Sequence, residues 1–244
     1  MIDLHCHILP ALDDGPVELA DSVAMAAQAE DDGIELICAT PHIRHDHDVR
    51  IHELGDRVDQ LNAALRSGGS RVRVTTGGEV AETAAEALDD ADLRRVSLGG
   101  GGGWILLEPR PGPLSDSLAR VVEKLAERGY RSLIAHPERH PSPAMIERLT
   151  ELTTRGALIQ GTAAYLEGEG APLLYLATHG LLHVVGSDSH SSHVGRPVRI
   201  SPALRRLDEV ELLAPHVDWI AHRAPEAIVR GEPMEPPFAP ATSV

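Results

Sequence analysis

His5 and His7 are separated by one residue and follow a short apolar run at the start of the chain. Two imidazoles at this spacing at the end of a strand can converge on one metal ion. Asp13 and Asp14, shortly behind them, can supply hard oxygen ligands, and Asp13 is the weaker candidate of the two. A single His-x-His pair is a weak signal. The same pattern, a short apolar run that ends in His, Asp or Glu, recurs along the chain and indicates a metal centre built from several strands.

The elements that must position these residues alternate between strand and helix. The predicted strands are Ile2–Cys6, Glu35–Thr40, Arg71–Gly77, Trp104–Glu108, Ser132–His136, Ala157–Gly161 and His183–Ser187. The predicted helices are Val17–Asp32, Ile51–Arg66, Ser115–Arg128, Ser142–Arg155, Pro172–Thr178 and Pro202–Leu213. Seven strands that alternate with helices predict an α/β fold, a complete or incomplete parallel barrel of the TIM type.

Polar residues stand at the carboxyl ends of six of the seven predicted strands. These ends lie on one face of a parallel barrel, where such enzymes carry their active sites. The residues of metal-ligand type at this face are His5, His7, Asp14, His42, Glu79, Glu108, His136, Asp188 and His190. Nine ligands are too many for one ion. Mixed imidazole and carboxylate ligation suits Zn, Mn or Fe, and bridging carboxylates suit a cluster of two or three ions.

The bulk composition limits the class of protein. The 244 residues carry a formal net charge of −15, which argues against a nucleic-acid-binding surface. Cys6 and Cys38 provide no disulfide framework. We expect a cytoplasmic protein, since the sequence starts with a strand rather than a signal peptide and has no apolar run of membrane-spanning length. We expect one domain over residues 1–230, a Pro-rich tail over 231–244, and a flexible turn at Gly99–Gly103 on the amino-terminal face of the barrel.

These residues carry a resemblance to a known family. The opening MIDLHCHILPALDDG at residues 1–15 and the segment AHPER at 135–139 are its specific parts, supported by ATPH at 39–42, GGE at 77–79, LEP at 107–109 and SDSH at 187–190. They resemble the PHP (polymerase and histidinol phosphatase) superfamily, in particular the bacterial manganese-dependent tyrosine phosphatases of capsule and exopolysaccharide clusters. The similarity runs from Met1 to about Arg230 and implies a distorted seven-stranded (β/α) barrel.

The resemblance also implies a function. It implies a trinuclear site held by the nine residues above, with Mn the expected ion and Fe or Zn as alternatives. The implied partner is a phosphotyrosine protein, such as the Tyr-rich tail of a membrane-associated bacterial tyrosine kinase. Some positions depart from the family: Ser191 stands where Asn is usual, Arg196 comes one residue later than expected, and Gln160 to Thr162 match only loosely.

The expected reaction is hydrolysis of a phosphomonoester. Divalent cations lower the pKa of a bridging water, so that hydroxide can attack phosphorus in line. Guanidinium groups match phosphoryl oxygens in a bidentate way, and Arg139 and Arg196 are the candidates. Glu108 is expected to bridge two ions. His42 or Asp188 is conceivable as a general acid, although the sequence does not decide between them.

Three alternatives remain open. The first is a histidinol-phosphate phosphatase or another small-molecule phosphomonoesterase of the same fold. The second is a cysteine-dependent tyrosine phosphatase, because Cys38 and Arg44 fit a Cys-x5-Arg pattern; Pro41 removes a backbone donor that such a loop needs. The third is a non-catalytic metal-binding module. His45 and His47 form a second His-x-His pair that has no strand before it and that we interpret as a polar loop.

Overall fold

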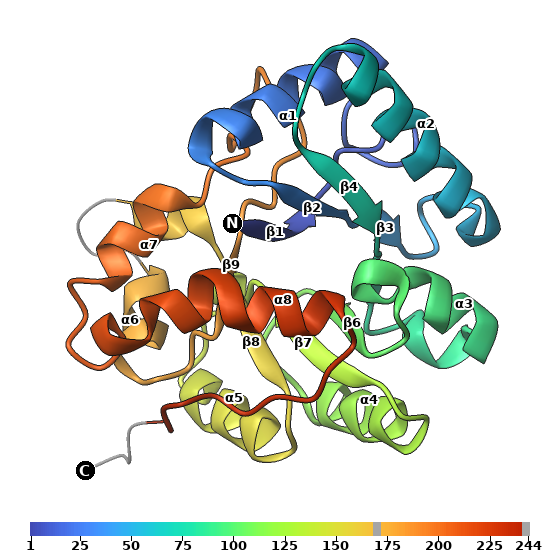
Figure 1. The fold of residues 1–244 in the computed structure, drawn as a ribbon. Coiled ribbons are helices and arrows are strands. Elements are labelled where there is room, and N and C mark those ends of the chain that lie inside the picture. Colours follow the sequence, from blue (N-terminus) through green and yellow to red (C-terminus); the bar gives the residue numbers. More distant parts are fainter. Residues whose placement is uncertain (168–171, 241–244) are drawn as a thin grey trace.

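The computed structural model describes residues 1–167 and 172–240, and these form one α/β domain whose strands are all parallel (Figure 1). The strands are β1 (Ile2–Cys6), β2 (Leu36–Ala39), β3 (His42–Ile43), β4 (Arg73–Thr76), β5 (Glu79–Ala81), β6 (Trp104–Glu108), β7 (Arg131–Ala135), β8 (Leu158–Thr162) and β9 (Val184–Gly186). The α-helices are α1 (Leu19–Asp32), α2 (Leu54–Ser67), α3 (Asp90–Val96), α4 (Asp116–Glu127), α5 (Met145–Thr154), α6 (Pro172–Thr178), α7 (Ser201–Leu207) and α8 (Ala224–Val229).

Short helical turns connect several of these elements. The 3-10 turns are η1 (Ile51–Glu53), η2 (Ala85–Ala87), η3 (Leu98–Gly100), η4 (Pro137–Arg139), η5 (Ala163–Leu166) and η6 (Ala214–His216). One turn of π-helix, η7 (Trp219–Arg223), leads directly into α8. Of the predicted helices, that at 142–155 begins later, at Met145, and that at 202–213 ends earlier, at Leu207.

The strands belong to two sheets, β1-β2-β4 and β3-β5-β6-β7-β8-β9. The predicted strand Glu35–Thr40 corresponds to β2, and Pro41 separates it from the two-residue strand β3; Gly77 and Gly78 separate β4 from β5 in the same way. The sequence analysis predicted neither β3 nor β5. The sheets meet beyond β9, where the amide of Asp188 donates to the carbonyl of His5 at 2.8 Å. A parallel bridge between Cys6 and Ser189 lies beside it. If β2 with β3 and β4 with β5 are each counted as one interrupted strand, the nine strands correspond to the seven strands of a distorted barrel around one interior.

The interior of the barrel is apolar at its amino-terminal side. Leu4, Cys38, Trp104, Leu106 and Leu133 are fully buried there, together with Ala224 and Ile228 of α8. Helix α8 crosses in front of the strands in Figure 1 and covers this side of the interior. A second and larger cluster fills the space between the strands and the outer helices. The sequence analysis predicted neither α3 nor α8, because both are short and α8 carries Pro225 near its start.

The glycine run forms the predicted turn before β6. A Cβ on Gly99 would lie 2.2 Å from the carbonyl oxygen of Val229, and a Cβ on Gly103 would lie 2.3 Å from the Cα of Gly231. The turn therefore needs glycine because another backbone segment packs directly against it. The segment after α8 continues along the barrel, where the indole of Trp104 donates to the carbonyl of Glu232 at 2.9 Å. No helix among the described residues has the length and apolar character needed to cross a membrane.

The pH dependence of stability follows from His183, a buried residue just before β9. Its Nδ1 accepts a hydrogen bond from the amide of Ile159 at 3.0 Å, and its ring stacks on Phe238. Burial lowers the pKa of His183 from 6.5 to about 3. Between these two pH values the unfolded chain binds the extra proton, so the free energy of unfolding falls as the pH falls, by up to about 1.4 kcal/mol per pH unit.

When the pH is lowered from 7 to 5, we expect the free energy of unfolding to fall less in His183→Gln than in the wild type. Glutamine can still accept from the amide of Ile159 but carries no titratable group. Urea unfolding of both metal-free proteins at the two pH values measures the difference. His52→Gln is the control, because its side chain is 70% exposed. If the free energy of unfolding fell by the same amount in His183→Gln and in the wild type, His183 would not be a source of the pH dependence.

Candidate metal centre

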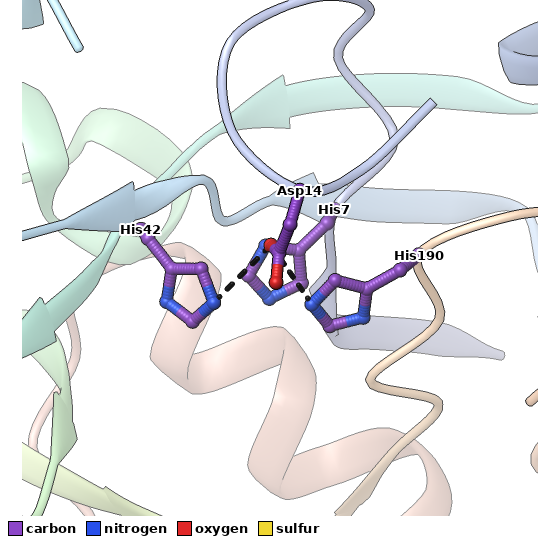
Figure 2. Close-up of side chains that lie close together, drawn as sticks. All are labelled: His7, Asp14, His42 and His190. Atoms are coloured by element: carbon purple, nitrogen blue, oxygen red, sulfur yellow. Dashed lines mark ion pairs between the residues drawn. The ribbon is translucent and has the colours of Figure 1, made fainter. Parts of the chain in front are cut away.

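The carboxyl ends of the strands bring all nine predicted ligand residues together. Their side chains form four groups in which one ligand atom per residue lies within 4.8 Å of every other. The groups are His7, Asp14, His42 and His190; His5, His136 and Asp188; His5, His7 and Glu79; and His42, Glu79 and Glu108. Figure 2 shows the first group, in which Asp14 Oδ1 lies 3.4 Å from a ring nitrogen of both His42 and His190.

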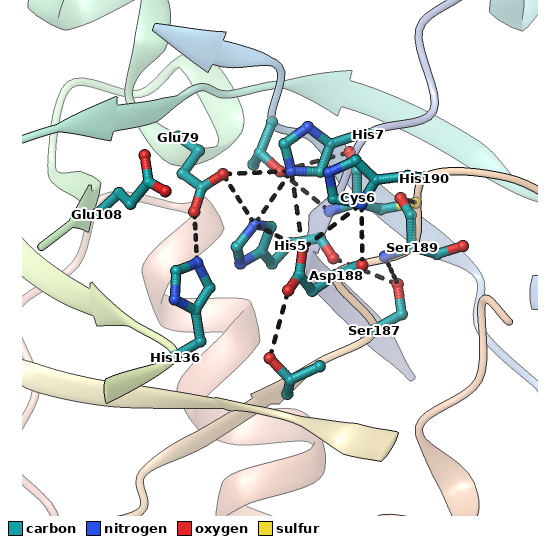
Figure 3. A network of polar contacts seen from close by, with 12 residues as sticks. His5, Cys6, His7, Glu79, Glu108, His136, Ser187, Asp188, Ser189 and His190 are labelled. Carbon is teal, nitrogen blue, oxygen red and sulfur yellow. Dashed lines mark hydrogen bonds and ion pairs between the residues drawn. The ribbon is translucent and has the colours of Figure 1, made fainter. Parts of the chain in front are cut away.

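Glu79 lies at the centre of the buried part of the site (Figure 3). Its Oε2 is 3.4 Å from His5 Nε2, 3.3 Å from His7 Nε2 and 2.9 Å from His42 Nδ1. Its Oε1 is 2.7 Å from His136 Nε2. Glu79 belongs to two of the four groups, whereas Glu108 belongs to one. Glu79, rather than Glu108 as expected from the sequence, is therefore the carboxylate that would contribute to more than one ion.

These spacings suit divalent cations better than they suit hydrogen bonds. Ligand atoms bound to one ion at ~2.1 Å lie roughly 3.0 to 3.5 Å apart. The two Nε2 atoms of His5 and His7 are 3.3 Å apart, which falls within the range for two ligands of one ion. Within the described part of the chain, Glu79 Oε2, His42 Nδ1 and His136 Nδ1 are buried without a partner in hydrogen-bonding geometry, although the first two atoms lie 2.9 Å apart. Buried polar atoms normally have one, so these residues fit a metal centre.

The backbone directs two of the ligands through an unfavourable conformation. His136 has φ of 31° and Asp188 has φ of 50°, in the left-handed region that non-glycine residues seldom adopt. His136 directly follows β7 and Asp188 comes two residues after β9, and each turn aims its side chain toward the centre. Such strain costs of order 1 kcal/mol or more and is typical of functional sites.

Two residues behind the ligands fix their orientation. Asp13 Oδ2 is 2.7 Å from His7 Nδ1 and also accepts from the amide of His42 at 2.9 Å. Burial alone would raise the pKa of Asp13, but the hydrogen bond from His7 holds it below its usual range. Gln160 Oε1 lies 3.0 Å from His5 Nδ1. Partners of this kind set the tautomer of a ligating histidine. The sequence signalled Asp13 only through its place beside Asp14, and Gln160 only as part of a segment that matches the family loosely.

The ionisation of the carboxylates reflects the same arrangement. Burial alone would raise the pKa of Glu79, but His5, His136 and His42 together hold it well below its usual range. Burial and the nearby charge of Glu79 raise the pKa of Glu108. For Asp188, the charges of His5, His136 and Arg139 outweigh burial and keep the pKa low. A carboxylate with a low pKa is suited to bind cations and is a poor proton donor.

A cavity of about 410 Å³ opens beside these groups. Among the described residues, its lining comprises Asp14, His42, Arg44, Glu108, Arg139, His190, Val194, Gly195 and Arg196. Both predicted arginines contact Asp188 there: Arg139 forms an ion pair with its Oδ2, and Arg196 Nη2 lies 3.1 Å from the same oxygen. The sequence analysis did not predict that Arg44 would line this cavity. His45 is exposed, and neither it nor His47 belongs to a metal-type group of the described residues.

Cys38 lies outside the cavity. It is fully buried in β2 within the apolar interior, and burial raises the pKa of its thiol to about 12. A thiol in such surroundings is a poor nucleophile. The Cys-x5-Arg interpretation is therefore not supported by the geometry.

Fold and site together define a metal-dependent hydrolase of the PHP fold. Residues 1–229 match the family described as capsular polysaccharide synthesis, CpsB/CapC. The tyrosine-protein phosphatase YwqE of Bacillus subtilis is 34% identical over 200 residues, which are 78% of each chain. The tyrosine-protein phosphatase CpsB of Streptococcus pneumoniae is 24% identical over 203 residues, 78% of this chain and 83% of that protein. The chain belongs to the CpsB/CapC family.

Solved structures agree with this membership. One from a study of YwqE and CpsB, described as unique metal-dependent tyrosine phosphatases, aligns over 100% of both chains with a TM-score of 0.81 and 28% identity. Dihydropyrimidinase from Brevibacillus agri aligns over 99% of this chain and 73% of its own, with a TM-score of 0.53 and 12% identity. The second likeness concerns the fold alone.

Substitution of the two central carboxylates distinguishes their roles. We expect Glu79→Gln to lose more bound manganese than Glu108→Gln, because Glu79 contributes to two groups of ligands and Glu108 to one. Elemental analysis after loading with Mn²⁺ and dialysis measures the content, and circular dichroism checks that both variants fold. If Glu108→Gln lost more bound manganese than Glu79→Gln, Glu108 would instead be the carboxylate that contributes to more than one ion.

Proposed function

We propose that this protein is a metal-dependent protein-tyrosine phosphatase that acts on a tyrosine kinase of capsule or exopolysaccharide synthesis. The observation that carries the proposal is the cavity itself, in which groups of metal-ligand type and arginines face one space. A phosphoryl group carries negative charge and needs this combination of cations and guanidinium donors. The names of the curated relatives support phosphotyrosine as the substrate.

The nine residues of the four groups would hold two or three divalent ions, and mixed imidazole and carboxylate ligands suit Mn²⁺. When bound, the ions supply Lewis acidity and lower the pKa of a coordinated water. The chain contributes the orientation of the ligands through Asp13 and Gln160. It also contributes a cavity wall in which Arg139 and Arg196 can turn from Asp188 toward phosphoryl oxygens.

Two features favour a phosphotyrosine over an aliphatic phosphate. The phenol of tyrosine has a pKa of about 10, so its departure needs less protonation than that of an alkoxide. Asp188, once a candidate general acid, is better suited to a ligand role because its pKa is low; His42 remains a candidate. Val194 is 78% exposed and lines the cavity, so it offers an apolar surface to an aromatic ring.

The preferred substrate is an extended, Tyr-rich segment of the kinase, because the cavity opens directly at the surface beside Val194 and Gly195. The expectation of a cytoplasmic location stays a prediction. A histidinol-phosphate phosphatase is the alternative within the same fold, and it would use the same metal groups and arginines.

A substrate panel tests the proposal. We expect hydrolysis of a phosphotyrosine peptide to exceed that of a phosphoserine peptide and of histidinol phosphate in kcat/KM. Chelation should abolish the activity and added Mn²⁺ should restore it. Cys38→Ser should keep most of the activity, because Cys38 is buried away from the cavity. Activity that survives chelation but is lost in Cys38→Ser would overturn the metal mechanism; a tenfold preference for histidinol phosphate would assign the alternative function.

Removal of a guanidinium from the cavity tests phosphoryl binding. We expect Arg139→Ala to lower kcat/KM on the order of 100-fold at unchanged metal content, because the lost donor cannot be replaced. Arg196→Ala should act in the same direction. Arg128→Ala is the matched control, since Arg128 pairs with Asp90 on the surface outside the cavity. A loss below threefold would remove Arg139 from the mechanism.

A further inference from the structure

The segment after β3 forms a short loop beside the cavity, and its residues have no role in the mechanism so far. Arg44, Asp46 and His47 belong to this loop. The guanidinium of Arg44 uses each of its three nitrogens. Its Nε donates to Asp46 Oδ1 at 2.8 Å, its Nη1 to Glu108 Oε1 at 3.5 Å, and its Nη2 lies 3.2 Å from His47 Nε2. Arg44 is therefore held in place rather than free at the mouth of the cavity.

These contacts reach two ligand residues on different strands. Arg44 touches Glu108 of β6 directly. His47, bonded to Arg44, stacks on the ring of His42 of β3, with centroids 5.2 Å apart and planes inclined by 21°. Glu108 and His42 belong to the same group, in which Glu79 is the third member. This one loop thus contacts His42 and Glu108, the two residues that accompany Glu79 in this group.

This part of the centre has weak support from the backbone. Strand β3 has two residues, His42 and Ile43, and pairs with β5. The side chain of Glu108 is 18% exposed, whereas that of Glu79 is 1% exposed. A carboxylate that is partly exposed at the end of a strand can rotate into solvent. A guanidinium that holds one of its oxygens restrains the other oxygen toward His42, from which it lies 3.8 Å.

We propose that Arg44 is a positioning residue for the metal group formed by His42, Glu79 and Glu108. Its guanidinium fixes Oε1 of Glu108 and the ring of His47, and so holds Glu108 Oε2 and His42 ready to bind an ion. Partners of this kind change metal affinity by about 10- to 100-fold. The inference rests on the proposed metal centre but is independent of which phosphomonoester is hydrolysed.

Direct binding of the substrate by Arg44 is the competing role, because Arg44 lines the same cavity as Arg139 and Arg196. The contacts favour positioning. All three arginines contact a carboxylate of the ligand set, but Arg44 also contacts Asp46 and His47 of its own loop, so that each of its guanidinium nitrogens has a partner. If Arg44 positions the ligands, excess Mn²⁺ should restore the activity of a variant that lacks it. If Arg44 binds the substrate, excess Mn²⁺ should not.

The test compares Arg44→Ala and Arg44→Lys with Arg50→Ala. Arg50 is the control because its side chain is 65% exposed, pairs with Glu53 and lies outside the cavity. Calorimetric titration of chelator-treated protein with Mn²⁺ measures affinity and stoichiometry, and the activity on a phosphotyrosine peptide is followed against Mn²⁺ concentration. Thermal unfolding checks the fold of each variant.

We expect Arg44→Ala to bind one Mn²⁺ about 10-fold or more weakly, with kcat restored by excess Mn²⁺ and KM for the peptide unchanged. Arg44→Lys should recover part of the affinity, since an ammonium cannot span Glu108 and His47 together. Unchanged Mn²⁺ binding in Arg44→Ala would overturn the proposal. A raised KM that excess Mn²⁺ does not correct would also overturn it and assign Arg44 to the substrate. Absence of phosphotyrosine hydrolysis in the wild type would affect the proposed function but not the calorimetric result.

Discussion

The burial of one carboxylate among imidazoles is the constraint on which the site depends. Glu79 is 1% exposed and has four histidines within hydrogen-bonding or ion-pair distance. An isolated buried charge would cost several kcal/mol, so this position is tenable only when positive charge surrounds it. The compensating histidines come from β1 and the residue after it, from β3, and from the residue that follows β7. The positions of His5, His7, His42 and His136 are therefore linked through a single side chain.

The parallel barrel explains why so much of the site could be predicted from the sequence. A ligand at the carboxyl end of a parallel strand must lie at the same face as the others, so spacing along the chain translates into position. His5, Glu108 and His136 could be placed in this way. Cys38 could be excluded for the same reason, since a residue inside an apolar strand lies in the wall. The chain breaks at Pro41 and at Gly77 and Gly78 come just before His42 and Glu79, and both residues still lie at the metal-ligand face. The breaks therefore did not affect the predicted set of ligands.

The remaining features depend on contacts that no local pattern encodes. Asp13 orients His7 because its loop turns back on β1, and Arg44 reaches Glu108 across 64 residues of sequence. Helix α8 is short and begins with Ala224 and Pro225, so its periodicity is too brief to predict a helix. It forms because the interior of the barrel needs an apolar cover. Glycines 99 to 103, predicted as a flexible turn, are required by the backbone that packs on them.

The junction between the two ends of the barrel has a consequence for how the chain reaches its native state. The hydrogen bond between Asp188 and His5, and the packing of Ile228 near Leu4, join segments that are synthesised far apart in time. Contacts of such long sequence separation form late, because the intervening chain must first be ordered. During synthesis, the edge of β8 that pairs with β9 and the apolar surface that α8 covers stay exposed until those two elements have been made. Exposed apolar surface and unpaired strand edges make such intermediates prone to aggregation, so β9 and α8 protect the rest of the domain once they are in place.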